Sequence, residues 1–363
     1  MVTLEELLHV LMERKGSDLH ITAGSPPRVR VDGDLVPISE EVFSADDTQA
    51  IIYSILDNDQ IAKFEREKEL DMSFGISGVG RFRVNVFLQR GAVGTAIRVI
   101  PYEMKSFEQL GLPREVCQKM CCMPKGLILV TGATGSGKST SLASMIDYIN
   151  QTRKEHIITI EDPIEFIHRN KKCLVNQREV GPDTHSFAAA LKHVLRQDPD
   201  IVLIGEMRDM ETIELGLTLA ETGHLTFATL HTSDCTQTLN RIIDVFPANQ
   251  QSQIRTQLSF VLEGVFCQQL LPLSTGRGRC LASEIMLPTA GIRANIRDDK
   301  VHQIYSALQT GGKEGMQTMN MSLYNLCAAG KINQEIAFEH SSRTDDLQNL
   351  FDQAAREQAA RKR

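Results

Sequence analysis

Residues 126–140 read GLILVTGATGSGKST. The first six residues form a short apolar run typical of a buried strand, and the next eight fit the pattern G-x-x-x-x-G-K-S in full. We therefore predict a strand, a glycine-rich loop and a helix that begins at Lys138. In such a loop the glycines let backbone N–H groups surround phosphates, and the helix N-terminus adds a partial positive charge. This stretch predicts a nucleotide-binding α/β domain.

The expected ligands of the loop are ATP and Mg²⁺. Lys138 is placed to reach the β- and γ-phosphates, and the hydroxyl of Ser139 is placed to bind Mg²⁺. A chance glycine-rich turn is the alternative, and the surrounding strand and helix pattern disfavours it. The residues expected to bind the nucleotide are Gly132, Ala133, Thr134, Gly135, Ser136, Gly137, Lys138, Ser139 and Thr140.

Three further apolar runs follow at 157–160, 201–204 and 225–230, and the segment 187–196 between two of them has helical character. Nearly continuous apolar strands that alternate with helices indicate a parallel sheet covered on both faces. We therefore expect a mostly parallel sheet in this half of the chain.

The run 201–204 is followed by Gly205 and Glu206. A carboxylate that leaves the carboxyl end of a parallel strand enters the ligand crevice, so Glu206 is placed to orient or deprotonate a water and to bind Mg²⁺ directly or through water. Most enzymes with this loop carry an aspartate where Gly205 stands, so the metal shell would depend more on Ser139 and on waters. The alternative role of Glu206 is to cap the next helix.

Acids and histidines follow or flank the other strands. Glu161 and Glu165 belong to the acidic segment 161–165, which would suit a metal and water network beside the γ-phosphate, or else form a solvated loop. His224 and His231 bracket the strand at 225–230, where a histidine could sense the γ-phosphate, relay a subunit contact or serve only the structure.

Residues 1–100 have the pattern of a small α+β module. Strict alternation over 81–87 predicts a strand, and 96–100 is its expected hairpin partner. Arg81, Arg83 and Arg98 lie on this hairpin; they either reach a nucleotide or point to solvent, and we place Arg81 and Arg83 on opposite faces of the strand. Residues 101–124 would connect the domains with one short helix, and 345–363 would be a helical or frayed tail.

Composition restricts the function classes. The chain has 363 residues, 42% of them apolar, and a net charge of -7, which argues against broad nucleic-acid binding. We recognise no signal peptide and no apolar run long enough to span a bilayer. The eight cysteines form no C-x-x-C pair, which gives zinc little support, and they are expected to be reduced and mostly buried in a cytoplasmic protein.

Several strings together resemble the type II/IV secretion ATPase superfamily. They are SDLH at 17–20, the phosphate loop, EDPIE at 161–165, GEMRD at 205–209 and ATLHT at 228–232. The strings RFRVN at 81–85 and GMQTM at 315–319 make the chain most similar to the retraction ATPases of type IV pili, over nearly its whole length.

The resemblance implies a PAS-like domain over 1–100, a linker over 101–124, a RecA-like ATPase domain over 125–290 and a C-terminal helical region over 291–363. It also implies a homohexamer, with ATP bound between the two domains and contacted by the arginines. Glu206 matches the family's catalytic glutamate, Glu161 and Glu165 match its Asp box, and His224 and His231 match its His box.

The implied partners are an inner-membrane pilus platform protein and paralogous pilus ATPases, with a peripheral location at the inner membrane and no insertion into it. The family's retraction signature AIRNLIRE reads GIRANIRD at 291–298, so four positions differ. An accessory retraction paralogue or a nucleotide-gated partner of another motor is therefore an alternative. An assembly or type II secretion ATPase and a nucleic-acid translocase are less compatible with the absent cysteine pairs and the acidic charge.

Overall fold

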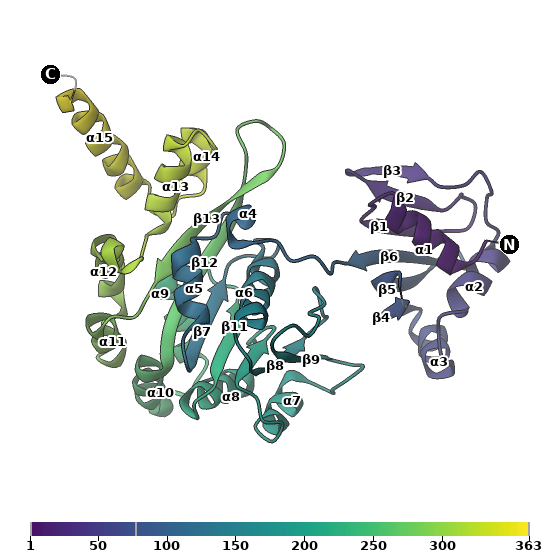
Figure 1. Cartoon of the computed structure of the whole chain (residues 1–363), viewed down its shortest axis with the longest axis horizontal. Coiled ribbons are helices and arrows are strands. Elements are labelled where there is room, and N and C mark those ends of the chain that lie inside the picture. The colour runs from purple at the N-terminus through teal and green to yellow at the C-terminus, as the bar shows by residue number, and fades with distance from the viewer. Residues whose placement is uncertain (1, 77, 362–363) are drawn as a thin grey trace. The chain divides into compact units, whose positions relative to one another are not determined.

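The computed structural model describes residues 2–76 and 78–361 and contains two compact units. The first comprises the chain up to Glu103 together with Glu165–Ile167, and the second contains Met104–Ile164 and the chain from His168 onward. Each unit has its own sheet and its own hydrophobic core (Figure 1).

The first unit is built on an antiparallel sheet of six strands in the order β3-β2-β1-β6-β5-β4. Its strands are β1 (Asp18–Ile21), β2 (Arg28–Val31), β3 (Asp34–Pro37), β4 (Glu69–Ile76), β5 (Gly80–Gln89) and β6 (Ala92–Ile100), and its helices are α1 (Leu4–Glu13), α2 (Ala45–Tyr53) and α3 (Asn58–Glu67). The predicted hairpin is the pair β5–β6.

Alternation along β5 separates a core face from a polar face. Phe82, Val84 and Val86 are fully buried in the core with the leucines of α1. Arg81 and Arg83 lie on the other face, and both lie on the same side because residues two apart in a strand point the same way. The prediction that they point to opposite faces is therefore wrong.

The second unit contains a seven-stranded sheet in the order β13-β12-β7-β11-β10-β8-β9. All neighbouring strands are parallel except the antiparallel pair β12–β13, so the prediction of a mostly parallel sheet is confirmed. The strands are β7 (Gly126–Thr131), β8 (His156–Glu161), β9 (Leu174–Glu179), β10 (Ile201–Ile204), β11 (Leu225–Leu230), β12 (Leu262–Pro272) and β13 (Arg279–Met286). The sequence pattern did not reveal β9, β12 or β13.

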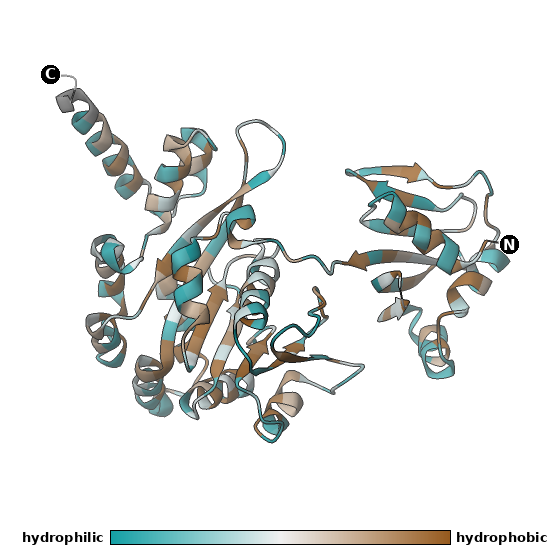
Figure 2. Cartoon of the chain, viewed as in Figure 1, coloured by the Kyte–Doolittle hydropathy of each residue, from teal (hydrophilic) through white to brown (hydrophobic). Residues whose placement is uncertain are grey.

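The central strands of this sheet are buried on both faces. Every residue of β7, β10 and β11 is buried, and Figure 2 shows hydrophobic central strands with more polar helices around them. Helices in the order of the chain are α4 (Phe107–Leu110), α5 (Arg114–Cys121), α6 (Lys138–Thr152), α7 (Phe187–Val194), α8 (Met210–Glu221), α9 (Cys235–Asp244) and α10 (Ala248–Val261).

The segment 101–124 differs from the expected connection. It contains two helices, α4 and α5, and from Met104 onward it belongs to the second unit. The buried side chains of these helices join the core of the central sheet. These 21 residues therefore pack as part of the second unit.

The C-terminal region is helical, as expected. It contains α11 (Ala290–Arg297), α12 (Ile304–Thr310), α13 (Met319–Ala328), α14 (Gln334–Glu339) and α15 (Thr344–Arg361), with short 3₁₀ turns at Val301–Gln303 and Gly311–Glu314. Helices α13 to α15 share a separate hydrophobic cluster with the outer ends of β12 and β13. The predicted tail is thus a helix through Arg361.

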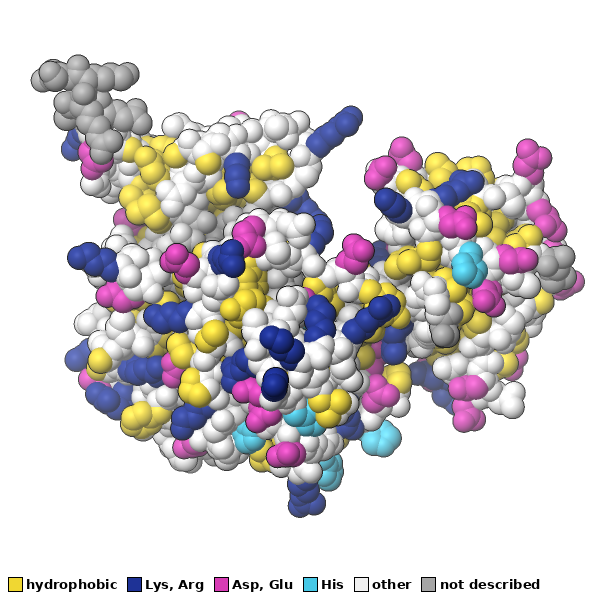
Figure 3. All heavy atoms as spheres, in the orientation of Figure 1, with side chains coloured by type: hydrophobic (Ala, Val, Ile, Leu, Met, Phe, Trp, Pro, Cys, Tyr) yellow, Lys and Arg dark blue, Asp and Glu magenta, His cyan; other side chains and the backbone are white. Residues whose placement is uncertain are grey.

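Within residues 2–76 and 78–361, no helix is long and apolar enough to cross a bilayer. Acidic and basic side chains are mixed over the face shown in Figure 3. Five of the eight cysteines are buried, and all eight are free thiols, as expected for reduced residues.

Candidate nucleotide site

The predicted phosphate loop lies between β7 and α6, and α6 begins at Lys138 as expected. Gly132 and Gly137 have φ angles of 144° and 88°, which residues with side chains rarely adopt. A Cβ on Gly132 would lie 2.4 Å from the carbonyl oxygen of Gln268 and 2.5 Å from Ser136 Oγ. The loop therefore has no room for a side chain at Gly132, where it packs directly against Gln268 and Ser136.

Donor groups gather at this loop. Lys138 Nζ donates to the carbonyl oxygens of Gly132 (2.8 Å) and Ala133 (3.1 Å), so its ammonium lies against the loop. Ser136 Oγ is buried and has no hydrogen-bond partner among the described residues. The N-terminus of α6 adds unpaired N–H groups. Positive charge, free donors and a loop without side-chain bulk fit a bound phosphate chain.

A cavity of about 220 Å³ adjoins the loop. Its lining residues are Gly132, Ala133, Thr134, Gly135, Ser136, Ser233, Gln268, Gln269, Leu270 and His340. Gln268, which sequence reasoning missed, donates from Nε2 to the carbonyl oxygen of Ser136 (2.7 Å) and is almost fully buried. Gln268 lies on β12, which pairs with β7, the strand that leads into the loop. Its hydrogen bond therefore ties the loop to the neighbouring strand.

The strand order brings further predicted residues to the same edge of the sheet. The carboxyl ends of parallel strands lie together, and the order places the end of β11 beside the phosphate loop, then β10, then β8. His231 comes directly after β11, and Glu161 is the last residue of β8. Glu206 comes after β10, with one residue between them. These three predicted residues therefore lie at the edge that carries Lys138.

Glu206 is held between Arg208 and His231. Its Oε2 lies 2.8 Å from Arg208 Nη2, and its Oε1 lies 3.2 Å from His231 Nε2. Burial raises the pKa of Glu206, but the hydrogen bond from Arg208 and the charge of His231 outweigh burial and lower the pKa below its ordinary value. Glu206 in turn raises the pKa of Arg208. The carboxylate is therefore kept ionised and is held in place by both partners.

The structure explains the glycine at position 205. A Cβ there would lie 3.0 Å from the carbonyl oxygen of Ile160 and 3.1 Å from the Cα of Glu161, both of them backbone atoms. The N–H of Gly205 also donates to the oxygen of Ile160 (2.7 Å), which draws β8 and β10 together. An aspartate side chain has no space at this position, so other residues must supply the carboxylates.

Glu161 is the neighbouring carboxylate. Its Oε1 accepts hydrogen bonds from Thr159 Oγ1 (2.6 Å) and from Gln177 Nε2 (3.2 Å). Gln177 lies on β9, which the sequence pattern did not reveal, so the partner of Glu161 was missed. These two bonds fix the direction of the Glu161 side chain at the edge of the sheet.

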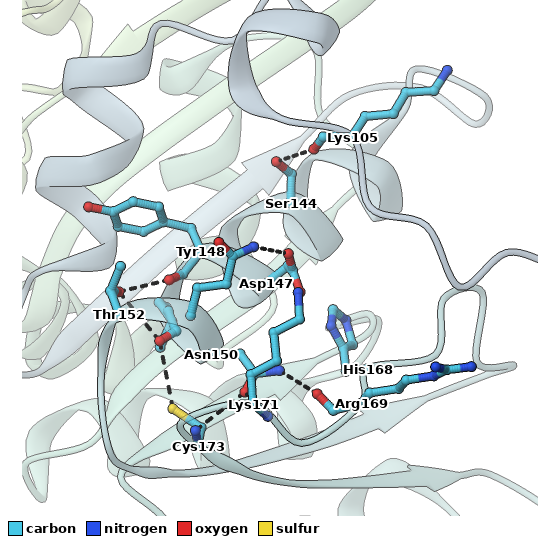
Figure 4. Close-up of polar contacts among 12 residues, drawn as sticks. Lys105, Ser144, Asp147, Tyr148, Asn150, Thr152, His168, Arg169, Lys171 and Cys173 are labelled. Carbon is cyan, nitrogen blue, oxygen red and sulfur yellow. Dashed lines mark hydrogen bonds and ion pairs between the residues drawn. The ribbon is translucent and has the colours of Figure 1, made fainter.

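The segment that follows the acidic residues is fastened to α6, the helix that begins at the phosphate loop (Figure 4). Asn150 is fully buried; its side chain donates to the oxygen of Arg169 (2.7 Å) and accepts from the backbone N–H groups of Lys171 (3.1 Å) and Cys173 (3.3 Å). The ammonium of Lys171 also pairs with Asp147 of α6 at 2.5 Å. Helix α6 thus supports both the phosphate loop and the chain that leads into β9.

His168 lies at the start of this segment and is buried. Its backbone N–H donates to Gln177 Oε1 (2.7 Å), and its ring Nδ1 has no hydrogen-bond partner among the described residues. Burial lowers the pKa of His168 to about 4, although the charge of Asp147 opposes this shift. The ring is therefore neutral at physiological pH, and Gln177 connects its backbone with Glu161.

Two predicted residues do not join this group. Glu165 lies in the short segment that belongs to the first unit. His224 precedes β11, at the end opposite His231, and its Nδ1 lies 3.1 Å from both the oxygen of Leu219 and Thr222 Oγ1. Six strand residues separate the two histidines by about 20 Å. Within this chain His224 therefore lies away from the phosphate edge.

The predicted arginines lie together on the polar face of the first unit's sheet. Arg83 stands directly opposite Arg98 in the β5–β6 pair, and Arg81 lies two residues before Arg83 and donates from Nη2 to Ser73 Oγ (2.9 Å). Directly opposed like charges destabilise a sheet unless an anion offsets them. This face is suited to an anionic ligand.

The segment 291–298 that resembles the retraction signature forms α11 and its C-cap. Ile292 and Ile296 are fully buried, so they serve the core. Arg293 donates to the oxygens of Ser259 and Phe260 and pairs with Glu263 at 3.0 Å. Arg297 is about half exposed and pairs with the similarly exposed Asp298 at 3.3 Å.

A buried group of possible metal ligands lies elsewhere in the second unit. The ligand atoms of Cys235, Cys267 and Glu284 all lie within 4.8 Å of one another. Glu284 already accepts the backbone N–H groups of Cys235 (2.8 Å) and Met319 (3.3 Å), the first residues of α9 and α13. Two helix N-termini at the carboxylate disfavour a cation there, and burial raises the thiol pKa of Cys235 well above its ordinary value. The carboxylate of Glu284 is therefore already bound by two backbone donors.

Comparison with known proteins shows which family this chain resembles. The model of the family described as type II/IV secretion system protein matches residues 2–295. The type IV pilus retraction ATPase PilT of Pseudomonas aeruginosa is 51% identical over 93% of this chain and 97% of its own length. A twitching motility protein of Neisseria gonorrhoeae is 46% identical over 88% of this chain and 86% of its own, and the pilus ATPase PilU of P. aeruginosa is 42% identical over 96% and 91%.

Among solved structures, the crystal structure of the pilus retraction motor PilT with bound ADP aligns with a TM-score of 0.89 and 49% identity. The alignment covers 96% of this chain and all of that one. The ATPase DotB of Legionella pneumophila aligns with a TM-score of 0.80 and 26% identity over 92% and 93% of the two chains. Because the family model covers most of the chain and the relatives match along nearly their whole length, this chain belongs to the type II/IV secretion system protein family.

Proposed function

We propose that this chain is an ATP-hydrolysing motor subunit that drives retraction of type IV pili. The observation that carries the proposal is the phosphate loop with Lys138 against it and a paired, ionised Glu206 at the same edge of the sheet. The similarity to a retraction ATPase and to a structure with bound ADP supports the same activity.

In the proposed reaction a water attacks the γ-phosphorus of ATP, a P–O bond forms, and the bond to the β-phosphate oxygen breaks. Glu206 orients this water and accepts its proton. Lys138 and the N-terminus of α6 offset the charge that develops on the phosphate oxygens. His231 and Arg208 hold Glu206 before the nucleotide arrives, and exchange of these contacts for water would prepare the base.

The oxygen donors at the edge also suit Mg²⁺, which prefers hard oxygen ligands and keeps several waters. Ser139, in the first turn of α6, would bind the ion directly, and Glu206 would bind it through water. When bound, Mg²⁺ would neutralise phosphate charge. Glu161, fixed by Thr159 and Gln177, would orient the waters of this shell.

Six copies would form a ring in which Arg81, Arg83 and Arg98 contact nucleotide phosphates, with Arg98 in the binding set. Glu165 and His224 lie outside the phosphate edge of their own chain, so we assign them to contacts formed on assembly or domain closure. The ring would act at the cytoplasmic side of the inner membrane on a pilus platform protein, together with paralogous pilus ATPases.

The test is the steady-state ATPase activity of the purified protein, wild type against Glu206→Gln, with oligomer size measured in parallel. We expect Mg²⁺-dependent turnover by a wild-type hexamer. The variant should bind ATP with similar affinity and turn over at least about 100-fold more slowly. If both proteins bind ATP and neither hydrolyses it, the chain is instead a nucleotide-gated partner of another motor.

A further inference from the structure

The string SDLH at 17–20 has no part in the nucleotide site described so far. Its last three residues form the start of β1 in the first unit, and Ser17 directly precedes the strand. Leu19 is fully buried in the core, whereas Asp18 lies on the polar face of the sheet. Even on that face Asp18 is only 8% exposed, which is unusual for an aspartate and calls for a specific partner.

Asp18 has two close donors. Its Oδ1 accepts from Arg98 Nε (2.8 Å), and its Oδ2 accepts from Ser17 Oγ (2.7 Å). Burial raises the pKa of Asp18, but these two hydrogen bonds outweigh burial and lower the pKa below its ordinary value. The carboxylate is therefore charged and is held in one orientation by Ser17.

Register places Asp18 within a row of arginines. The row crosses five neighbouring strands, and each residue in it stands directly opposite the next. In order, the row consists of Ser73, Arg83, Arg98, Asp18 and Arg30. Asp18 is the acid in this row, and it pairs with the arginine that stands opposite Arg83. Arg30 instead donates to the oxygen of Gly33 in its own turn (2.6 Å).

The geometry of the Asp18–Arg98 pair leaves the outer nitrogens of Arg98 available for a second partner. The ion pair uses Nε, the inner nitrogen of the guanidinium, and the Arg98 side chain is 68% exposed. A guanidinium held through Nε keeps its planar outer fork, Nη1 and Nη2, for a second anion. An ion pair with so exposed an arginine contributes little to stability, so stability alone gives a weak reason for it.

We propose that Asp18 is a positioning residue that fixes the outer nitrogens of Arg98 for contact with the phosphates of the nucleotide. The inference rests on the proposed function, in which the arginines of the first unit contact ATP. Asp18 reaches the phosphates only through Arg98 and holds this arginine beside Arg83 before ATP arrives. Asp18 already offsets part of the repulsion between the two arginines, and a bound phosphate would offset it further.

The test compares the full-length variants Asp18→Asn, Arg98→Ala and the double variant with wild type, using steady-state ATPase and binding of labelled ADP. Asp18→Asn keeps the size of the side chain and removes its charge. Asp71→Asn is the matched control, because Asp71 lies on the same sheet face and is bonded to Asn85 instead of an arginine. Melting temperatures are measured for every variant.

We expect Asp18→Asn to lower kcat about tenfold, since a small misplacement of a positioned group has effects of this size. The KM for ATP and the Kd for ADP should change less than about threefold, and Asp71→Asn should match wild type. The decisive result is the double variant: its kcat should equal that of Arg98→Ala, because Asp18 has nothing left to position.

Three outcomes overturn the proposal. Losses that multiply in the double variant would show that Asp18 acts independently of Arg98, and a normal kcat in Asp18→Asn beside a lowered kcat in Arg98→Ala would show that Arg98 needs no positioning. A normal kcat in Arg98→Ala itself would remove both Arg98 and Asp18 from the nucleotide site. The ATPase activity of the chain is tested separately by Glu206→Gln, so that activity can stand when this proposal fails.

Discussion

Replacing Gly205 by alanine tests whether the end of β10 must lack a side chain. The added Cβ would lie 3.0 Å from the oxygen of Ile160 and 3.1 Å from the Cα of Glu161, both closer than ordinary contact. These atoms belong to the backbone of β8 and cannot swing aside as a side chain can. We expect the ends of β8 and β10 to separate by a few tenths of an ångström, which costs about 1–3 kcal/mol in the free energy of unfolding.

The same displacement should change kcat more than it changes the affinity for nucleotide. Glu161 and Glu206 flank the added methyl group, and misplacing such groups by a fraction of an ångström lowers kcat about 10-fold or more. The phosphate loop follows β7, with β11 between it and β10, so the Kd for ADP should stay within about twofold of wild type. The assays are urea unfolding, steady-state ATPase and titration with labelled ADP.

Gly216→Ala is the matched control for this experiment. Its Cβ would lie 3.0 Å from Met207 Sδ and 3.2 Å from Ile204 Cδ1, which are the ends of flexible side chains, and α8 itself favours alanine over glycine. We expect this variant to unfold within about 1 kcal/mol of wild type and to keep its kcat. Wild-type stability and kcat in Gly205→Ala would refute the steric reasoning.

Three further predictions concern the supports of the site. Asn150→Ala should lower the free energy of unfolding by about 2–4 kcal/mol, because three buried or half-buried backbone groups lose their hydrogen-bond partner. The control Gln151→Ala, at an exposed position, should change the free energy of unfolding by less than about 1 kcal/mol. Equal effects of the two substitutions in urea unfolding would contradict this prediction. Gln268→Leu leaves the oxygen of Ser136 without its donor, so the Kd for ADP should rise roughly 5- to 30-fold, and an unchanged Kd would show that the loop needs no such support. His168 has a pKa of about 4 when folded and 6.5 as a free group, so below pH 6.5 the unfolded chain binds a proton that the folded chain does not. Stability should therefore fall by up to about 3 kcal/mol from pH 6.5 to 4, and His168→Gln should remove most of this slope in urea unfolding at fixed pH values.

Local patterns predicted the residues around the phosphate loop well. The strand, the glycines and the start of α6 lie within 15 consecutive residues, so their geometry depends on short-range constraints that the sequence states directly. Glu206 and His231 each follow an apolar strand, and parallel strands necessarily bring their carboxyl ends together. For these residues, the sequence pattern and the sheet topology predict the same position at the edge of the sheet.

The supports of the site could not be predicted in the same way. Gln177 and Gln268 lie on β9 and β12, and their partners are 16 and 132 residues away in the chain. No local pattern specifies such pairings, which depend on the order of strands in the finished sheet. The cluster of Cys235 and Glu284 was missed for the same reason, since 49 residues separate its members.

The prediction for His224 shows a limit of motif reasoning. His224 and His231 belong to one sequence motif because they directly precede and follow β11. An extended strand of six residues, however, keeps the residues at its two ends about 20 Å apart. Only His231 can therefore share the phosphate edge with Glu206 in one chain.

The measurement that tests the motor function most directly is pilus retraction in living cells. A host that makes type IV pili and lacks its own retraction ATPase would express this chain, either wild type or Glu206→Gln, at matched levels, and labelled pili would be followed by fluorescence microscopy. We predict that the wild type restores retraction and that Glu206→Gln leaves pili extended. Equal retraction with both proteins would contradict the proposal that ATP hydrolysis at this site drives the motor.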